Sequence, residues 1–148
     1  QIRRRDLRAL EEAAIVEHRH ARRQLTREPL RRVGRAGHGV EHCALAGVAS
    51  FDDLDRLTIF ADNLVPHVLR CDGVLVYDER LAAHIDAGRE LRLGPQEHEI
   101  RACAVHACEL LAARLGVQSR VLDNCLWTRG QAHAYKARPR HRCRCVYY

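Results

Sequence analysis

The chain has 148 residues, a net charge of +6 and 30% charged residues, a composition that excludes a disordered or low-complexity protein and suits a single folded domain. No stretch is apolar for the length of a membrane span, and no secretory signal is evident. The basic balance is almost entirely arginine, which allows an anionic partner such as a nucleotide or RNA without proving one.

Seven cysteines occur at irregular spacing, and their odd number argues against a complete set of disulfides. We expect reduced thiols in a cytoplasmic protein. Cys103 and Cys108 fall on the apolar stripe of one expected helix, so we interpret them as core residues rather than zinc ligands. The chain starts at Gln1 and lacks methionine, which suggests a fragment or a processed chain.

Residues 1–50 differ from residues 51–148, and we treat the two parts as separate units. The first part is rich in arginine and is interrupted by Pro29, Gly34, Gly37 and Gly39. An RNA-binding arm is one interpretation. We favour a solvated lead-in, because no aromatic residues for base stacking are interleaved with the cations.

The segment that follows, 52–65, predicts a helix that starts at Asp52 or Asp53 and ends before Pro66. Asp62 then falls near the C-terminus of this helix, where the dipole disfavours an anion. The simpler interpretation is a solvated surface aspartate. The alternative is a functional site, since local rules are often broken at such sites.

Three further helical segments are predicted: 66–70, 79–87 with Asp78 as cap and Gly88 as stop, and 95–115 between Gly94 and Gly116. A further apolar segment lies at 121–127. The helix over 95–115 has the strongest apolar periodicity. The run from 129 to the terminal tyrosines reads mainly as a loop. With few strand signals, we expect an all-α domain.

Residues able to do chemistry are few. There is no plausible Ser/His/Asp set and no glycine-rich phosphate loop. The carboxylates Asp62, Glu99 and Asp123 each lie beside apolar residues. A carboxylate can stabilise the positive charge that develops on the sugar when an N-glycosidic bond breaks, so two or three of them in a basic pocket would suit a phosphorylated nucleoside.

From Phe51 onward the sequence resembles the queuosine salvage protein family, the queuosine 5′-phosphate N-glycosylase/hydrolases. The resemblance covers about two thirds of the chain. It rests on five segments in the family's order: FDDLDRLTIFADNLVP at 51–66, GVLVYDERLAAHIDAG at 73–88, EHEIRACAVHACELL at 97–111, LDNCLWTRGQ at 122–131 and RPRHRCRCVYY at 138–148.

This resemblance implies an all-α fold similar to that of helix-hairpin-helix DNA glycosylases. Family members are longer at the N-terminus, so we expect an incomplete fold with low stability or self-association. The implied reaction is hydrolysis of queuosine 5′-phosphate to queuine and ribose 5-phosphate, which recovers queuine for tRNA modification. The partner is then a small nucleotide, with no metal or organic cofactor, no membrane and no stable nucleic-acid partner.

The resemblance also implies site residues. The family's Phe-Ala-Asp motif places the catalytic carboxylate on Asp62, and Asp123 is similar to a second acidic position. The expected substrate-binding residues are Phe60, Asp123, Trp127, His141, Arg142 and Tyr147. We infer a phosphate-binding role for the basic stretch 138–144 from its charge.

The chain departs from the family pattern directly after Asp62. Asn63, Leu64 and His67 replace an aromatic residue, a cation and a glutamine, and Cys143 and Cys145 stand where small hydroxyl residues are usual. Two alternatives therefore stay open: a non-catalytic basic helical module that binds RNA, and an inactive fragment of the enzyme. Oligomeric state is not predicted.

Overall fold

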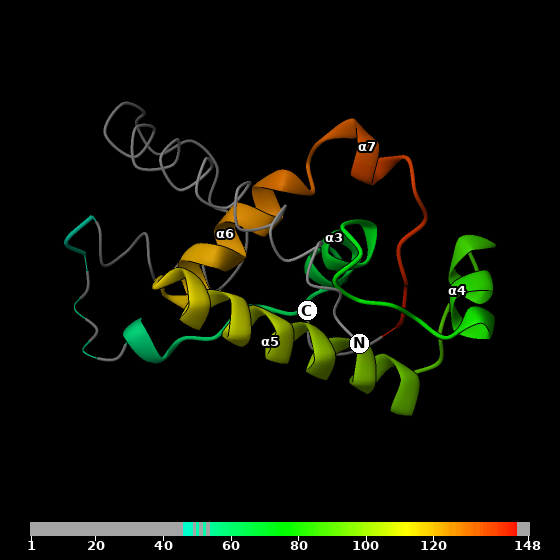
Figure 1. Ribbon diagram of the computed structural model, residues 1–148, viewed down its shortest axis with the longest axis horizontal. Helices are drawn as coiled ribbons and strands as arrows, with labels where there is room; N and C mark the ends of the chain where they lie inside the picture. The colour runs from blue at the N-terminus through cyan, green and yellow to red at the C-terminus, as the bar shows by residue number, and fades with distance from the viewer. Residues whose placement is uncertain (1–45, 49, 51, 53, 145–148) are drawn as a thin grey trace.

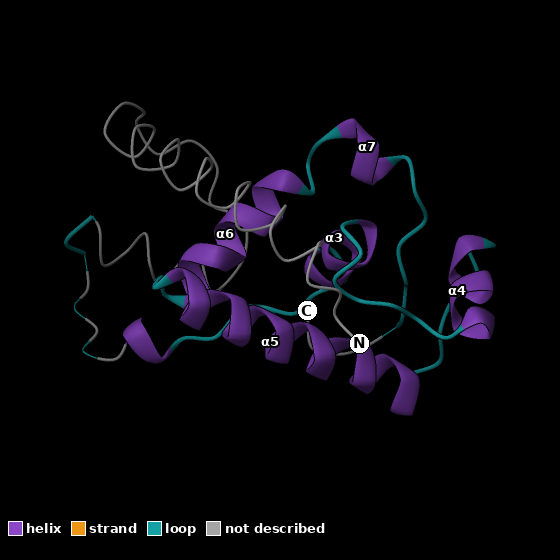
Figure 2. Ribbon diagram, in the orientation of Figure 1, coloured by secondary structure: helices purple, strands orange, loops and turns teal. Residues whose placement is uncertain are grey.

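The computed structural model describes residues 46–48, 50, 52 and 54–144. Within that part the chain forms helices joined by loops, with no strand and one isolated bridge between Leu91 and Cys143 (Figure 2). The expected all-α class is confirmed for this part. The elements are η1 (Leu54–Arg56), α3 (Val65–Cys71), α4 (Glu79–Asp86), α5 (Pro95–Leu115), α6 (Ser119–Arg129) and α7 (His133–Lys136).

Three of the helices enclose the main core. The long helix α5 runs beneath α3 and α6, and α7 lies beyond α3 (Figure 1). Short aliphatic side chains from α3, α5 and α6 fill the space between them, as the low aromatic content predicts. A second, smaller cluster of Ile85, Leu91 and Ile100 attaches α4 to the start of α5. No helix in the described residues is long and apolar enough to cross a membrane.

The expected helix over 52–65 is wrong. Only the single turn η1 forms there, and residues 57–64 have no regular secondary structure. The cause is local: the side chain of Asp62 accepts hydrogen bonds from the backbone N–H groups of Leu64 at 2.6 Å and Val65 at 3.2 Å. A side chain that accepts hydrogen bonds from the backbone N–H groups of the following residues competes with a helix that would include its own residue.

Asp62 therefore stands before the N-terminus of α3, where the helix dipole favours an anion, and not at a helix C-terminus. The surface interpretation of Asp62 is wrong as well, because the residue is 1% exposed. The short helix expected after it does form, as α3, with Pro66 in its first turn.

The local start and stop signals of the later helices are confirmed. Asp78 caps α4 by accepting from the N–H of Arg80 at 3.0 Å, and α5 runs from Pro95 to a left-handed Gly116 with a φ of 64°. α6 contains the apolar segment 121–127 and extends beyond both of its ends. The run expected to be a loop contains the single turn α7.

The buried face of α5 differs from the expected stripe at one edge. Cys108 is buried, and burial raises the pKa of its thiol to about 12. Cys103, expected in the core, is exposed. The buried face runs instead from Glu97 through Ile100 and Ala104, so that a carboxylate occupies the first buried position of the helix.

Candidate functional site

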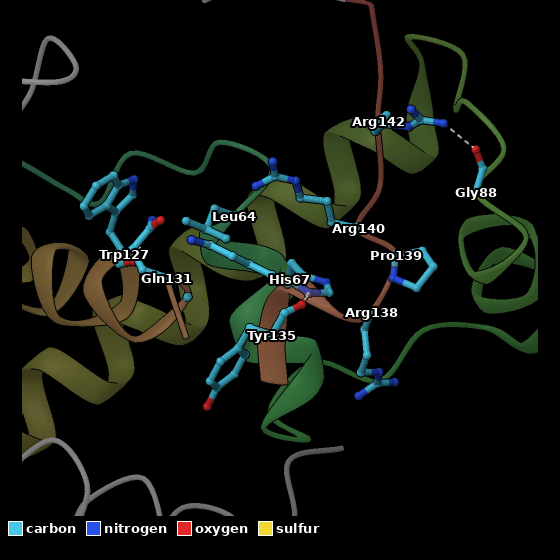
Figure 3. A pocket seen from close by; sticks show the side chains of 12 residues that line it. Leu64, His67, Gly88, Trp127, Gln131, Tyr135, Arg138, Pro139, Arg140 and Arg142 are labelled. Carbon is cyan, nitrogen blue, oxygen red and sulfur yellow. Dashed lines mark hydrogen bonds between the residues drawn. The ribbon is translucent and has the colours of Figure 1, made fainter. Parts of the chain in front are cut away.

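A pocket of about 470 Å³ opens between the start of α3, the end of α6, α7 and the segment 138–142 (Figure 3). Pockets of this size accommodate small ligands. Its lining combines one half-buried tryptophan, one tyrosine and several cations. The lining residues are Leu64, His67, Gly88, Trp127, Gly130, Gln131, Tyr135, Lys136, Arg138, Pro139, Arg140 and Arg142.

The pocket is electropositive. Lys136, Arg138, Arg140 and Arg142 line it and are all exposed. Burial lowers the pKa of His67, and the guanidinium groups of Arg138 and Arg140 lower it further, although a hydrogen bond to a backbone carbonyl raises it. The lowered pKa favours the neutral imidazole, and the fixed positive charges of the arginines beside it suit an anion such as a phosphate.

Hydrogen bonds hold the wall of this pocket to α3. Asp72, directly after α3, accepts from the hydroxyl group of Tyr135 at 2.7 Å and from Nε of Arg129 at 3.0 Å. His67 donates from Nε2 to the carbonyl oxygen of Tyr135 at 2.8 Å, since a carbonyl can only accept. Burial, followed by the bond to Asp72, raises the pKa of Tyr135 to about 12. Together these bonds fix α7 and the end of α6 against α3.

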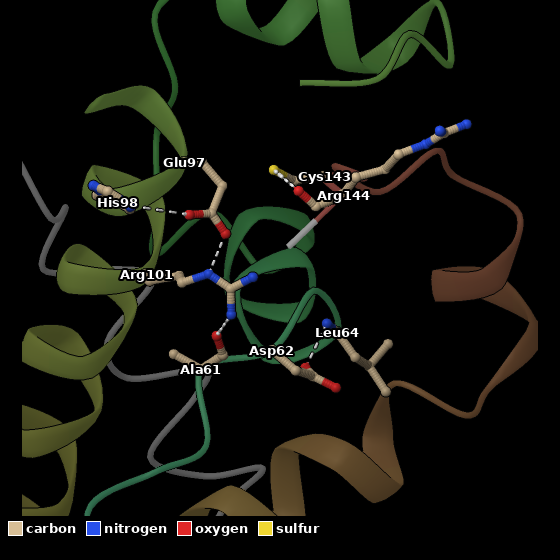
Figure 4. Close-up of polar contacts among 8 residues, drawn as sticks. All are labelled: Ala61, Asp62, Leu64, Glu97, His98, Arg101, Cys143 and Arg144. Atoms are coloured by element: carbon tan, nitrogen blue, oxygen red, sulfur yellow. Dashed lines mark hydrogen bonds and ion pairs between the residues drawn. The ribbon is translucent and has the colours of Figure 1, made fainter. Parts of the chain in front are cut away.

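A second set of polar side chains is buried beside α3 and α5 (Figure 4). Glu97 has no exposed side-chain surface, and its Oε1 accepts from Nε of Arg101 one helical turn later. Nη1 of Arg101 donates to the carbonyl oxygen of Ala61 at 2.5 Å. The guanidinium group therefore bridges α5 and the segment that contains Asp62.

His141 belongs to the same buried group. It is 2% exposed, and neither ring nitrogen has a hydrogen-bond partner among the described residues. Burial lowers its pKa to about 4, and the charge of Arg101 acts in the same direction, whereas Glu97 and Asp62 act against it. A buried neutral imidazole without partners costs free energy, roughly 1–3 kcal/mol for each unsatisfied group, so it has capacity to bond a ligand.

The expected site residues separate into three groups. Trp127 and Arg142 line the pocket. Asp62 and His141 are buried and interact electrostatically, but neither lines the pocket; the nearest lining residues in the chain are Leu64 and the two arginines that flank His141. Asp123 is buried on α6 and Phe60 is 38% exposed, both away from the lining, and Tyr147 lies outside the described residues.

Sequence reasoning missed the pair Glu97–Arg101 and selected Glu99, which is exposed. The available signal was the i,i+4 spacing of opposite charges, with Glu97 three residues before the buried Ile100. Tyr135 and Gln131 were also missed; no local pattern marks them. The replaced positions Leu64 and His67 both line the pocket.

No group of three His, Cys, Asp or Glu residues in the described part could hold a metal ion. No disulfide bond joins any two of the five cysteines in that part. The polar groups at hand include the cations that line the pocket, the buried carboxylates beside it and the unpartnered imidazole of His141.

A model of the family described as "Queuosine salvage protein" matches residues 41–148, which begins ten residues before the first resembling segment. The chain belongs to the queuosine salvage protein family. Curated relatives named "Queuosine 5′-phosphate N-glycosylase/hydrolase" agree. The relative from Mus musculus is 34% identical over 117 residues, which cover 69% of this chain and 35% of the relative.

Two further relatives of the same name come from distant organisms. The protein from Dictyostelium discoideum is 36% identical over 115 residues, covering 69% of this chain and 34% of the relative. The protein from Sphaerobacter thermophilus is 36% identical over 107 residues, covering 68% of this chain and 33% of the relative. This queuosine salvage family member therefore spans about a third of the length of the curated relatives it matches.

Proposed function

We propose that this chain binds queuosine 5′-phosphate and takes part in hydrolysis of its N-glycosidic bond, which yields queuine and ribose 5-phosphate. Family membership supports the reaction class. The observation that carries the proposal for this chain is the arginine-rich pocket of about 470 Å³ with aromatic groups in its lining. A pocket of that volume suits a single nucleotide better than an extended RNA strand.

In this proposal the cations and the aromatic residues divide the substrate between them. The guanidinium groups of Arg138 and Arg140 and the ammonium group of Lys136 bind the 5′-phosphate. Trp127 and Tyr135 offer flat apolar surfaces to the base. Phe60, Asp123 and Tyr147 stay in the proposed substrate-binding set on the resemblance alone.

The chemical step is proposed for two buried residues, Asp62 and His141. Water adds its oxygen to C1′ as the bond to the base nitrogen breaks, one proton of the water is released, and the departing base takes up a proton. Asp62 stabilises the positive charge that grows on the ribose. His141, a neutral imidazole with unsatisfied nitrogens, hydrogen-bonds the departing base.

Asp62 is 1% exposed, so contact with the ribose requires the groups that cover the carboxylate to move aside while Asp62 itself stays in place. We include that movement in the proposal. The likeness to helix-hairpin-helix glycosylases, a fold completed by further sequence, the lack of a cofactor and a cytoplasmic location are parts of the same proposal.

The test is release of free queuine from queuosine 5′-phosphate by the purified chain, measured beside Asp62→Asn and Arg140→Gln. We expect release by the parent and none by Asp62→Asn. Arg140→Gln should raise KM, and this increase should be smaller when queuosine without its phosphate is the substrate. Arg80→Gln, an exposed arginine on α4, is the matched control. No release by parent protein shown to be folded would reject the activity for this chain.

A salt series separates the proposal from RNA binding. Binding to RNA through phosphate contacts weakens steeply as salt rises. We expect little affinity for a tRNA transcript at physiological salt and a mild salt dependence of queuine release. Tight, salt-sensitive RNA binding without release would favour the RNA-binding interpretation instead.

A further inference from the structure

We propose that Glu97 and Arg101 are positioning residues that hold the Ala61–Asp62 peptide in place, so that Asp62 is oriented for the proposed reaction. This inference rests on the proposed function. It concerns two side chains on α5 that the sequence pattern does not assign to the site. The geometry points to them because Arg101 is the side chain that joins α5 to the residue preceding Asp62.

The guanidinium group uses two of its edges. Nε donates to Glu97 Oε1 within α5, and Nη1 donates to the carbonyl oxygen of Ala61, forty residues earlier in the chain. Because the guanidinium is planar and rigid, fixing one edge fixes the direction of the other. Glu97, fully buried, sets the rotation of Arg101, and Arg101 sets the position of the Ala61 carbonyl (Figure 4).

Residues 57–64 lack the internal hydrogen bonds of a helix or strand. Oδ1 of Asp62 accepts bonds from the backbone of Leu64 and Val65, and these bonds orient Asp62 against α3. The bond from Arg101 to the Ala61 carbonyl holds this segment against α5. The charges of Arg101 and Asp62 both act on the imidazole of His141, so the pair lies close to both groups proposed for the chemistry.

Stability alone is a weak explanation for the pair. Removing two charges from water costs about as much as their attraction returns, and well-packed apolar residues often replace buried ion pairs without loss. The side chain of Glu97 is 0% exposed and that of Arg101 is 18% exposed. An apolar pair could fill this volume, but it could not bond the Ala61 carbonyl.

The experiment compares Arg101→Lys with Arg80→Lys in the whole chain. Lysine keeps the charge but cannot bond Glu97 and Ala61 in two fixed directions. We expect Arg101→Lys to lower kcat for queuine release by about a hundredfold with KM within about twofold, as small misplacements of reacting groups do. Arg80→Lys, exposed on α4, should change neither.

A second readout does not depend on activity. Amide hydrogen exchange at Leu64 and Val65 should accelerate about fivefold in Arg101→Lys, the effect of weakening a cap by about 1 kcal/mol, while exchange at 122–126 in α6 stays unchanged. If the parent releases no queuine, the function fails and this readout still judges the pair. Unchanged exchange at Leu64 and Val65, or equal acceleration throughout the chain, would overturn the inference.

Chemical rescue provides the last discrimination. Methylguanidine added to Arg101→Ala should restore part of the protection at Leu64 and Val65, and part of kcat, because it can occupy the vacated site between Glu97 and the Ala61 carbonyl. Methylamine of equal charge is the matched control and should not. Equal rescue by both compounds would show that charge alone matters, and it would contradict a positioning role.

Discussion

Asp62 accepts a hydrogen bond from the backbone N–H of Leu64, with 2.6 Å between Oδ1 and N. The same oxygen accepts from Val65 at 3.2 Å, so one carboxylate satisfies two of the unpaired donors at the start of α3. Leu64 in turn lines the pocket. The residue proposed for the chemistry therefore also determines where the pocket wall begins.

This double role predicts different results for two substitutions of Asp62. Asparagine keeps an acceptor oxygen, so Asp62→Asn should change the free energy of unfolding by less than about 1 kcal/mol while abolishing queuine release. Asp62→Ala loses the cap and should cost about 1–2 kcal/mol. Urea unfolding measures both. Asp78→Asn and Asp78→Ala at the cap of α4 are the matched pair, with the same stability pattern and unchanged activity.

Asp72 is predicted to be the residue that most strongly ties the pocket wall to α3. Asp72→Asn weakens charge-assisted bonds to Arg129 and Tyr135, and it should lower the free energy of unfolding by about 1–2 kcal/mol. Binding of ribose 5-phosphate, measured by calorimetry, should weaken as well, because Tyr135 lines the pocket.

Asp86→Asn is the control for that change. The side chain of Asp86 is 48% exposed in its pair with Arg70, so its loss should cost less than about 0.5 kcal/mol. Equal destabilisation by the two variants would show that Asp72 is no more important than a surface ion pair.

Gly130 is predicted to tolerate no side chain, because the end of α6 packs directly on α3. A Cβ atom there would lie 2.9 Å from a methyl group of Leu64 and 2.9 Å from one of Val68. Leu64 can swing aside, but Val68 is β-branched and confined to few rotamers. Gly130→Ala should cost roughly 1–3 kcal/mol and reduce ligand binding, since Gly130 lines the pocket.

Gly94→Ala serves as the comparison for the glycine prediction. Its backbone is extended, with a φ of 164°, and nothing lies within 4 Å of a Cβ built there. The thermal midpoint should stay within about 1–2 °C of the parent, which corresponds to a change of less than about 0.5 kcal/mol. A stable Gly130→Ala protein would contradict the close packing of α3 and α6.

His141 is predicted to make stability fall as the pH drops below 6.5. Its pKa is lowered from 6.5 to about 4 in the folded chain, so between these values the unfolded state binds more protons and stability rises with pH. His67, whose pKa is also lowered by burial, acts in the same direction. From pH 7 to pH 5 the contribution of His141 amounts to a loss of about 2 kcal/mol.

Urea unfolding of His141→Gln at the two pH values measures this contribution. The groups that act on His141 are Arg101 and Glu97 from α5, Asp62, and His67 from α3. The variant should lose about 2 kcal/mol less than the parent over that range. His106→Gln, exposed on α5, should keep the parent's full dependence. Identical pH dependence in parent and His141→Gln would refute the assignment.

The sequence by itself determined the helical class, the bounds of α4 and α5, and the family. These depend on neighbouring residues: Asp78 and Gly88 bound α4, while Pro95 and Gly116 bound α5, through bonds and dihedral angles that a few consecutive residues settle. The same local chemistry misled at Asp62, because an aspartate can cap the helix that follows instead of belonging to the one before.

The tertiary structure decided which polar groups meet. The bond from Arg101 to Ala61 spans forty residues, and those from Tyr135 and Arg129 to Asp72 span about sixty, so no periodicity within one helix contains them. The packing of α3 against α5, α6 and α7 forms the main core, and in the folded chain Glu97 and His141 are buried while Cys103 is exposed. A residue becomes buried only when a second surface of the protein packs against it, and a single stretch of sequence specifies only one of those two surfaces.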